Sequence, residues 1–303
     1  MLIRFWLLLL CLVCAGSAWS ADGKWKDTLV VDGSGNGDYR TLTEAMEGIR
    51  AFMDYRVTVL VRNGVYREKL VVPSWLQNVD FVGEDAEKTV ITFDDHANIR
   101  RMGTFRTYTL KVEGNGITFR NLTIENNAPP LGQAVALHTE GDRLVFVGCR
   151  FLGNQDTVYT GAAGTRLYFK DCYIEGTTDF IFGPATALFE DCVIHSKRNS
   201  YITAASTPPG VEVGYVFLNC RLTAASDVDK VYLGRPWHAG SDPFAVGYAV
   251  YIQCELGAHI HPDGWTDMGG FLGRNGHVTT EILVKICTAL DCGIEDIMEV
   301  TPE

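Results

Sequence analysis

Short strands with one buried face dominate the pattern of hydrophobic and polar positions between residues 110 and 260. Apolar and polar residues alternate there in brief runs that end in turn-forming residues, as in strands that pack on one side. One unit recurs: an aromatic residue, any residue, a small polar residue, Cys, any residue and an apolar residue. Copies begin at Phe146, Phe169, Phe189, Phe217 and Tyr251, and Phe119 begins an earlier copy with Leu in the Cys position.

The spacing of these copies indicates a solenoid. Successive copies begin 27, 23, 20, 28 and 34 residues apart, and periods of this size in β-rich segments are typical of chains that stack one coil on the next. β-Branched and aromatic residues dominate, so a helical repeat does not fit. We therefore predict an all-β protein with a parallel β-helix, whose variable intervals place the longer loops on one side of the coil.

The N-terminal part has the pattern expected for the start of such a coil. Strands are predicted over residues 29–31, 57–61 and 69–72, and a glycine-rich turn over 32–37. Helical spacing of apolar residues from Thr41 to Met53 predicts a helix. We expect this helix to cover the open end of the first sheet.

Residues 1–20 have the features of a secretory signal peptide. Arg4 precedes an apolar run, and Ala18 and Ser20 place small residues before the expected cleavage site. A lipoprotein interpretation at Cys14 is disfavoured because the bulky Val13 precedes it. We expect an exported protein, periplasmic or secreted, that has no membrane segment after signal removal. The net charge of −11 argues against nucleic acid as a partner.

The cysteines give a second view of the repeat. Nine are present, two of them within the signal, and an odd number remains for an exported chain. A disulfide framework is the usual interpretation of such a chain. Because most of these residues share one position of the repeat, we expect free thiols in the core instead.

Two neighbouring copies of the repeat carry the candidate chemistry. Cys149 and Cys172 are each followed by Gly four residues later and by Asp seven residues later, namely Asp156 and Asp179. On consecutive coils these aspartates would lie about 4.8 Å apart along the stack. Two carboxyl groups this close titrate together, and a nearby cation would keep one of them ionised. The pattern also fits two surface turns, and the spacing suits a retaining glycosidase equally well.

The sequence resembles the pectinesterase (pectin methylesterase) family over roughly residues 27–268. Five segments match motifs of that family in its order: 64–68 (GVYRE), 133–137 (QAVAL), 153–157 (GNQDT), 179–183 (DFIFG) and 233–237 (LGRPW). The resemblance implies a right-handed parallel β-helix and hydrolysis of the methyl esters of galacturonate in methyl-esterified homogalacturonan (pectin). We interpret Tyr66 and Glu68 in the first segment as structural.

The resemblance also implies a role for each residue of the site. Asp179 would be the nucleophile that forms an acyl-enzyme, and Asp156 the general acid and then base. Gln133 and Gln155 would donate hydrogen bonds to the oxyanion. Arg235 would pair with Asp179 and orient it. This chemistry needs no cofactor and no metal.

Aromatic residues near these positions are candidates for binding sugar. They are Trp237, Tyr159, Phe180 and Phe182, which together would line a groove. Packing alone would also account for Trp237. His259 and His261 have metal-ligand spacing, but we interpret them as part of a loop.

Residues 276–303 depart from the family pattern. Their apolar spacing after Thr280 predicts a helical segment that ends near Gly293. The segment resembles the C-terminal end of a small repressor-type helix-turn-helix protein. We expect three parts: a signal peptide over 1–20, a catalytic β-helix over 21–275, and a tail that is either a cap on the coil or a fusion.

The residues alone are also compatible with other functions. A pectin lyase or polygalacturonase would share the fold, and an inactive glycan-binding solenoid would share both the fold and the groove. We expect a monomeric pectinesterase.

Overall fold

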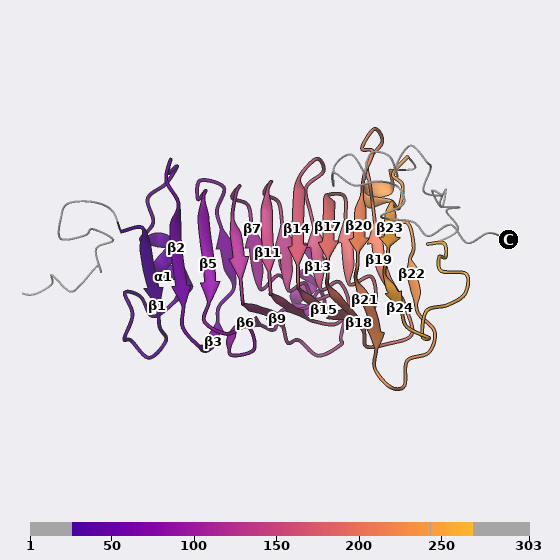
Figure 1. Cartoon of the computed structure of the whole chain (residues 1–303), viewed down its shortest axis with the longest axis horizontal. Helices are drawn as coiled ribbons and strands as arrows, with labels where there is room; N and C mark the ends of the chain where they lie inside the picture. The colour runs from indigo at the N-terminus through magenta and orange to yellow at the C-terminus, as the bar shows by residue number, and fades with distance from the viewer. Residues whose placement is uncertain (1–25, 243, 269–303) are drawn as a thin grey trace, which may run out of the picture.

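The chain winds into a single long coil of short strands. The computed structural model describes residues 26–242 and 244–268. Three parallel sheets run along the coil (Figure 1), and almost every turn of chain adds one strand to each sheet. The predicted all-β parallel β-helix is confirmed.

The first sheet carries the aromatic position of the repeat. Its strands in the described residues are β1 (Thr28–Val31), β2 (Val57–Val61), β5 (Val79–Gly83), β8 (Thr118–Arg120), β11 (Leu144–Val147), β14 (Arg166–Lys170), β17 (Thr186–Glu190), β20 (Tyr215–Leu218) and β23 (Ala249–Ile252). In register, Phe146 pairs with Phe169 and Phe169 with Phe189. Both pairs of rings stack with centroids 4.7 Å apart. The aromatic residues therefore form a continuous ladder inside the coil.

A tight turn leads from the first sheet to the second, and the small polar residue of the repeat forms this turn. Its described strands are β3 (Gly64–Arg67), β6 (Thr89–Phe93), β9 (Thr123–Asn126), β12 (Arg150–Leu152), β15 (Tyr173–Gly176), β18 (Val193–Ser196), β21 (Arg221–Ala224) and β24 (Glu255–Leu256). Asn121, Asp171, Asp191 and Asn219 have φ between 51° and 53°. This left-handed backbone favours short polar side chains, which explains that position of the repeat.

The third sheet forms the face on which the candidate site lies. Its described strands are β4 (Leu70–Val72), β7 (Leu110–Val112), β10 (Leu137–Thr139), β13 (Val158–Thr160), β16 (Ile181–Gly183), β19 (Tyr201–Ala205) and β22 (Tyr232–Gly234). Three short 3₁₀ helices lie in described loops that lead to or from this sheet: η1 (Ile99–Arg101), η2 (Thr104–Arg106) and η3 (Ala239–Ser241).

The cysteines of the repeat are free thiols, as predicted. Cys149, Cys172, Cys192, Cys220 and Cys254 form no disulfide. The thiol of Cys172 donates to the carbonyl oxygen of Phe146, one coil earlier, at 3.4 Å. Burial raises the pKa of the Cys149 thiol to about 12, so these groups are core packing residues. Cys287 and Cys292 lie outside the described residues.

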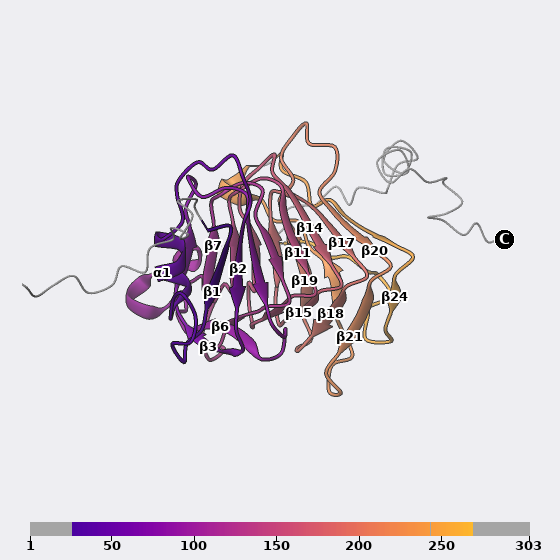
Figure 2. The same ribbon diagram turned by 60° about the vertical axis from the view of Figure 1, so that its left-hand side comes forward.

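The N-terminal helix lies at the end of the coil beside β1 (Figure 2), as predicted, but it is shorter than predicted. Helix α1 covers only Leu42–Glu47. Gly48 is its C-cap, and no larger residue fits there, because the Tyr39 hydroxyl lies 2.1 Å from the position that a Gly48 side chain would occupy. Ile49 and Met53 are still buried, so the apolar spacing continues after the helix has ended.

Tyr66 and Glu68 are structural, as interpreted from the sequence. Glu68 accepts hydrogen bonds from the backbone N–H groups of Leu42 and Thr43, at 2.9 and 3.0 Å. These are unpaired donors of the first turn of α1. The Tyr66 hydroxyl donates to the Arg62 carbonyl at 2.8 Å. The Glu68 contacts fasten α1 to the coil, and the Tyr66 contact closes the turn between β2 and β3.

Two predictions fall outside the described residues: the signal peptide over 1–20 and the helical tail over 276–303. Among the helices of the described part, none has the length and apolar character needed to span a bilayer.

Candidate active site

Asp156 and Asp179 lie on consecutive coils, each just before a strand of the third sheet. Val158 of β13 pairs with Ile181 of β16, and the same offset of 23 residues relates Asp156 to Asp179. The backbone N–H of Asp156 donates to Thr178 O at 3.1 Å, and that of Asp179 to Tyr201 O at 2.8 Å. Both residues have positive φ, 67° and 49°. The coil therefore brings the two carboxyl groups to one place, as the repeat predicts.

Arg235 reaches the same place from two coils beyond Asp179. It directly follows β22, and its backbone N–H donates to Thr203 O at 3.0 Å. Its guanidinium binds Asp179 through two hydrogen bonds, Nε to Oδ1 at 2.9 Å and Nη2 to Oδ2 at 2.6 Å. A bidentate pair fixes the orientation of the carboxylate as well as its charge.

The two carboxyl groups have different electrostatic environments. Asp156 and Asp179 are 8% and 7% exposed. Burial, and then the charge of Asp179, raise the pKa of Asp156 well above its usual value. Burial also raises the pKa of Asp179, but the hydrogen bonds and charge of Arg235 oppose that rise. The arrangement favours a protonated Asp156 beside an ionised Asp179, which is the division of roles that an acid and a nucleophile require.

A pocket of about 260 Å³ opens over these groups. Its lining consists of Thr104, Phe105, Gln133, Gln155, Asp156, Asp179, Phe182, Ala204, Arg235, Trp237 and Met268. Gln133 and Gln155 come from adjacent coils, since Ala134 N donates to Gln155 O at 3.1 Å. The structure thus brings together all five predicted catalytic residues.

The predicted aromatic groove is only partly correct. Trp237 and Phe182 line the pocket, with ring centroids 5.7 Å apart. Tyr159 stacks on Phe182 at 4.7 Å and extends the aromatic surface along the sheet. Phe180 was assigned wrongly, because its side chain is fully buried in the main core. It lies at the corner before β16, so the alternation of the strand does not extend to it.

The sequence reasoning missed four pocket residues, which are Thr104, Phe105, Ala204 and Met268. Phe105 is the largest of them: it is 46% exposed and its ring centroid lies 4.9 Å from that of Tyr159. It belongs to η2, in the loop between β6 and β7, which has no counterpart in the repeat. Ala204 faces outward next to Phe182 in register, and strand alternation through β16 and β19 would have found it.

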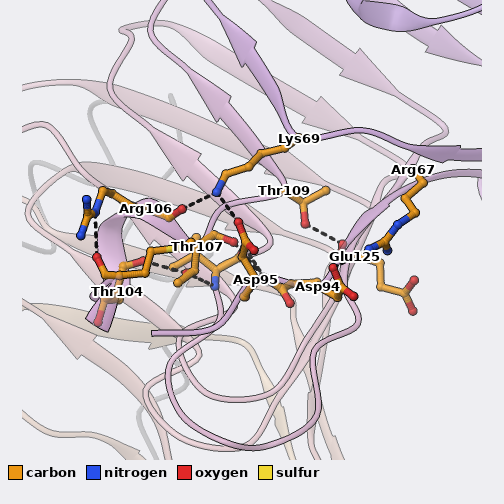
Figure 3. Close-up of polar contacts among 12 residues, drawn as sticks. Arg67, Lys69, Asp94, Asp95, Thr104, Arg106, Thr107, Thr109 and Glu125 are labelled. Carbon is orange, nitrogen blue, oxygen red and sulfur yellow. Dashed lines mark hydrogen bonds and ion pairs between the residues drawn. The ribbon is translucent and has the colours of Figure 1, made fainter. Parts of the chain in front are cut away.

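Buried polar contacts hold this loop in place (Figure 3). Lys69 forms an ion pair with Asp95 and donates to Arg106 O at 2.6 Å. The buried Asn126 amide donates to three carbonyl oxygens: Asp95 at 2.9 Å, Thr107 at 3.0 Å and Val135 at 3.0 Å. These contacts tie the loop to the sheet around Phe105.

Within residues 26–242 and 244–268, no group of three or more His, Cys, Asp and Glu side chains is placed to hold a metal ion. His259 and His261 lie beside an isolated bridge between Val231 and Ile260, and the His261 ring stacks on Tyr232 at 4.5 Å. The paired carboxyl groups, the arginine and the two amides are the chemistry available.

Fold and site together define a hydrolase of the parallel β-helix class. Comparison with known proteins specifies which one. The family model described as Pectinesterase matches residues 28–277. The chain is 39% identical over 250 residues to Pectinesterase 31 of Arabidopsis thaliana, an alignment that covers 79% of this chain and 76% of that protein. Several other curated relatives are longer, and the chain spans 43% to 46% of their length.

Solved structures agree with this match. Pectin methylesterase from carrot superimposes with a TM-score of 0.74 at 32% identity, covering 80% of this chain and 77% of that one. A pectin methylesterase in complex with a hexasaccharide has a TM-score of 0.74 at 25% identity, covering 90% of this chain and 98% of that one. The chain belongs to the pectinesterase family and is a carboxylic ester hydrolase with the right-handed parallel β-helix of that family.

A second family model matches the C-terminal end. A Cro/C1-type helix-turn-helix DNA-binding domain model matches residues 272–303, in agreement with the resemblance that the sequence suggested for residues 276–303. The two matches overlap over 272–277.

Proposed function

We propose that the chain hydrolyses the methyl esters of galacturonate units in methyl-esterified homogalacturonan through an acyl-enzyme on Asp179. One observation carries this assignment: the bidentate pair between Arg235 and Asp179, with Asp156 buried beside it in the same pocket. The oligosaccharide bound by the structurally similar pectin methylesterase supports a polymeric galacturonate substrate.

The first half-reaction releases methanol. A carboxylate oxygen of Asp179 attacks the ester carbonyl carbon, and the carbonyl electron pair moves onto its oxygen. The side-chain amides of Gln133 and Gln155 donate hydrogen bonds to this oxyanion; one such donor is worth about 3 kcal/mol. When the carbonyl re-forms, the C–O bond to the methoxy group breaks and Asp156 gives its proton to the departing oxygen.

The second half-reaction frees the enzyme. Asp156, now a carboxylate, takes a proton from a water molecule whose oxygen attacks the acyl carbon. The bond between that carbon and the Asp179 oxygen breaks, and Asp179 leaves as a carboxylate that pairs again with Arg235. Asp156 ends protonated, and the galacturonic acid formed releases its proton to the solvent, so the cycle closes with one galacturonate carboxylate, one methanol and one proton.

The groove orients the polymer. Trp237, Phe182 and Tyr159 offer apolar surface to sugar faces, and Phe105 adds to it through its ring contacts with Tyr159 and Trp237. We further propose that residues 1–20 direct export and are removed, that 21–275 form the catalytic domain, and that the exported enzyme is a monomer.

Alkali titration of methylated pectin tests the assignment. We expect Asp179→Ala and Asp156→Ala each to lose at least about 10²-fold in activity, the usual cost of removing a nucleophile or a general acid. Asp171→Ala is a matched control, because Asp171 has the same left-handed backbone (φ 53°) in an off-site turn. A loss of less than tenfold in either active-site variant contradicts the proposed roles. Chain shortening without methanol release would indicate a lyase or polygalacturonase instead.

A further inference from the structure

Tyr201, the first residue of β19, touches both members of the ion pair at the centre of the site. Its backbone carbonyl accepts the N–H of Asp179 at 2.8 Å. Its ring lies under the guanidinium of Arg235, with Cζ 4.0 Å from the ring centroid. Arginine stacks on aromatic faces while its N–H groups remain free at the edge. In this structure that edge donates both hydrogen bonds to Asp179.

The ring is itself held from the next coil. Tyr201 pairs in register with Tyr232 of β22, and their ring centroids lie 5.8 Å apart. The Tyr232 ring in turn stacks on His261 at 4.5 Å. Tyr201 therefore has a fixed position beneath Arg235, and its hydroxyl makes no hydrogen bond with the residues that the structure describes.

We propose that Tyr201 is a positioning residue that holds the Arg235 guanidinium in place when Asp179 is acylated. The inference rests on the proposed roles of Asp179 and Arg235. In the resting enzyme the ion pair and the ring act together to fix Arg235. Acylation converts the Asp179 carboxylate into a neutral anhydride, and most of the attraction to Arg235 is lost. The attraction between a cation and an aromatic ring does not depend on the charge of Asp179.

The arginine is needed again in the second half-reaction. As water attacks the acyl carbon, negative charge returns to the leaving Asp179 oxygens, and a guanidinium already in place stabilises it without reorganisation. Loss of the ring should therefore lower kcat more than it raises KM. We expect about a tenfold fall in kcat, the factor expected for a partly desolvated cation–π contact.

A pH profile separates this role from simple packing. Among the described residues, the charged or titratable groups around the pair of Asp179 and Arg235 are Asp156 and Tyr201. Arg235 holds the pKa of Asp179 down against the effect of burial. A guanidinium that is free to move lowers the pKa of Asp179 less. The acidic limb of kcat/KM should therefore move to higher pH when the ring of Tyr201 is removed.

The experiment compares Tyr201→Leu, Tyr201→Phe and wild type by pH-stat titration on methylated pectin, with thermal unfolding in parallel. Tyr201→Phe keeps the ring and should retain wild-type kcat and pH profile. Tyr173→Leu is the matched control, because the Tyr173 ring lies under Arg150 at 5.5 Å, away from the pocket; it should retain both. Wild-type kcat and pH profile in Tyr201→Leu, or an equal loss in Tyr201→Phe, would overturn the proposal.

A series of fluorinated phenylalanines at position 201 tests the proposal even if the leucine variant does not fold. The series is phenylalanine, 4-fluorophenylalanine and 3,4,5-trifluorophenylalanine. These side chains have nearly the same shape, but added fluorine progressively weakens the quadrupole of the ring and so its attraction for the Arg235 guanidinium. We expect kcat to fall along the series, and a flat series would overturn the proposal. Asp179→Asn in the same assay tests separately whether Asp179 is the nucleophile. Full activity of this variant would refute that role. An inactive Asp179→Asn together with an unchanged kcat across the fluorine series would refute only the role of Tyr201.

Discussion

The variants Arg235→Lys and Arg235→Ala measure how much the ion pair with Asp179 contributes to kcat/KM. The two hydrogen bonds to Asp179 are 2.9 and 2.6 Å long, and the side chains are 22% and 10% exposed. Lysine keeps the charge but cannot reproduce the bidentate geometry. Loss of one charge-assisted hydrogen bond of about 1.5–3 kcal/mol predicts a fall in kcat/KM of roughly 10- to 150-fold. Alanine leaves a buried carboxylate without its cation, and a cost of about 3–5 kcal/mol predicts roughly 10²- to 10³-fold or more.

The pH dependence of these variants has a definite sign. Asp179 acts as a carboxylate, burial raises its pKa, and Arg235 opposes that rise. Removing Arg235 therefore raises the pKa of Asp179 further, and the acidic limb of kcat/KM should move to higher pH. Initial rates of acid release at a series of pH values give this limb directly. A limb that stays in place or moves to lower pH in Arg235→Ala would refute the reasoning. Arg150→Ala, which removes an arginine from an off-site aromatic contact, serves as the control.

Three further predictions concern the scaffold. Asn126→Ala removes the amide that donates to three carbonyl oxygens, of which that of Val135 keeps the Thr109 N–H as a donor, so it should lower stability by about 1–3 kcal/mol and reduce activity through the loop that carries Phe105; an unchanged Tm would contradict this. Phe169→Ala removes a ring stacked on both sides at 4.7 Å and should cost about 3–5 kcal/mol in denaturant unfolding, with Phe169→Leu costing less. Because burial raises the pKa of Cys149 to about 12, this thiol should resist labelling at pH 8 in the native protein and react once the chain is unfolded; rapid native labelling would exclude a core position.

The sequence predicted those features that the repeat controls. One aromatic residue per coil sets the register of the first sheet, and that register brings Asp156 and Asp179 to equivalent positions. The motif around Arg235 placed the cation correctly as well. These residues are predictable because a one-residue slip would turn every buried side chain outward.

Other features depend on contacts between segments that no local pattern records. Phe105 reaches the pocket because Asn126 and Lys69 fasten its loop, and neither Phe105 nor Lys69 belongs to the repeat unit. Phe180 packs inward at a corner where its Cβ would lie 2.2 Å from a side chain on Gly176; the glycine that admits it lies four residues earlier. The glycine at the C-cap of α1 is likewise required by Tyr39, which packs across it.

The position of Arg235 after β22 has a consequence for how the enzyme fails. Within the described residues β22 is the last strand of its sheet, whereas Asp179 and Asp156 lie two and three coils further inside. In a stacked repeat, fraying begins at an end and advances inward. Heating should therefore withdraw the guanidinium before the aspartates separate, and catalysis should be lost while most of the β-structure signal persists.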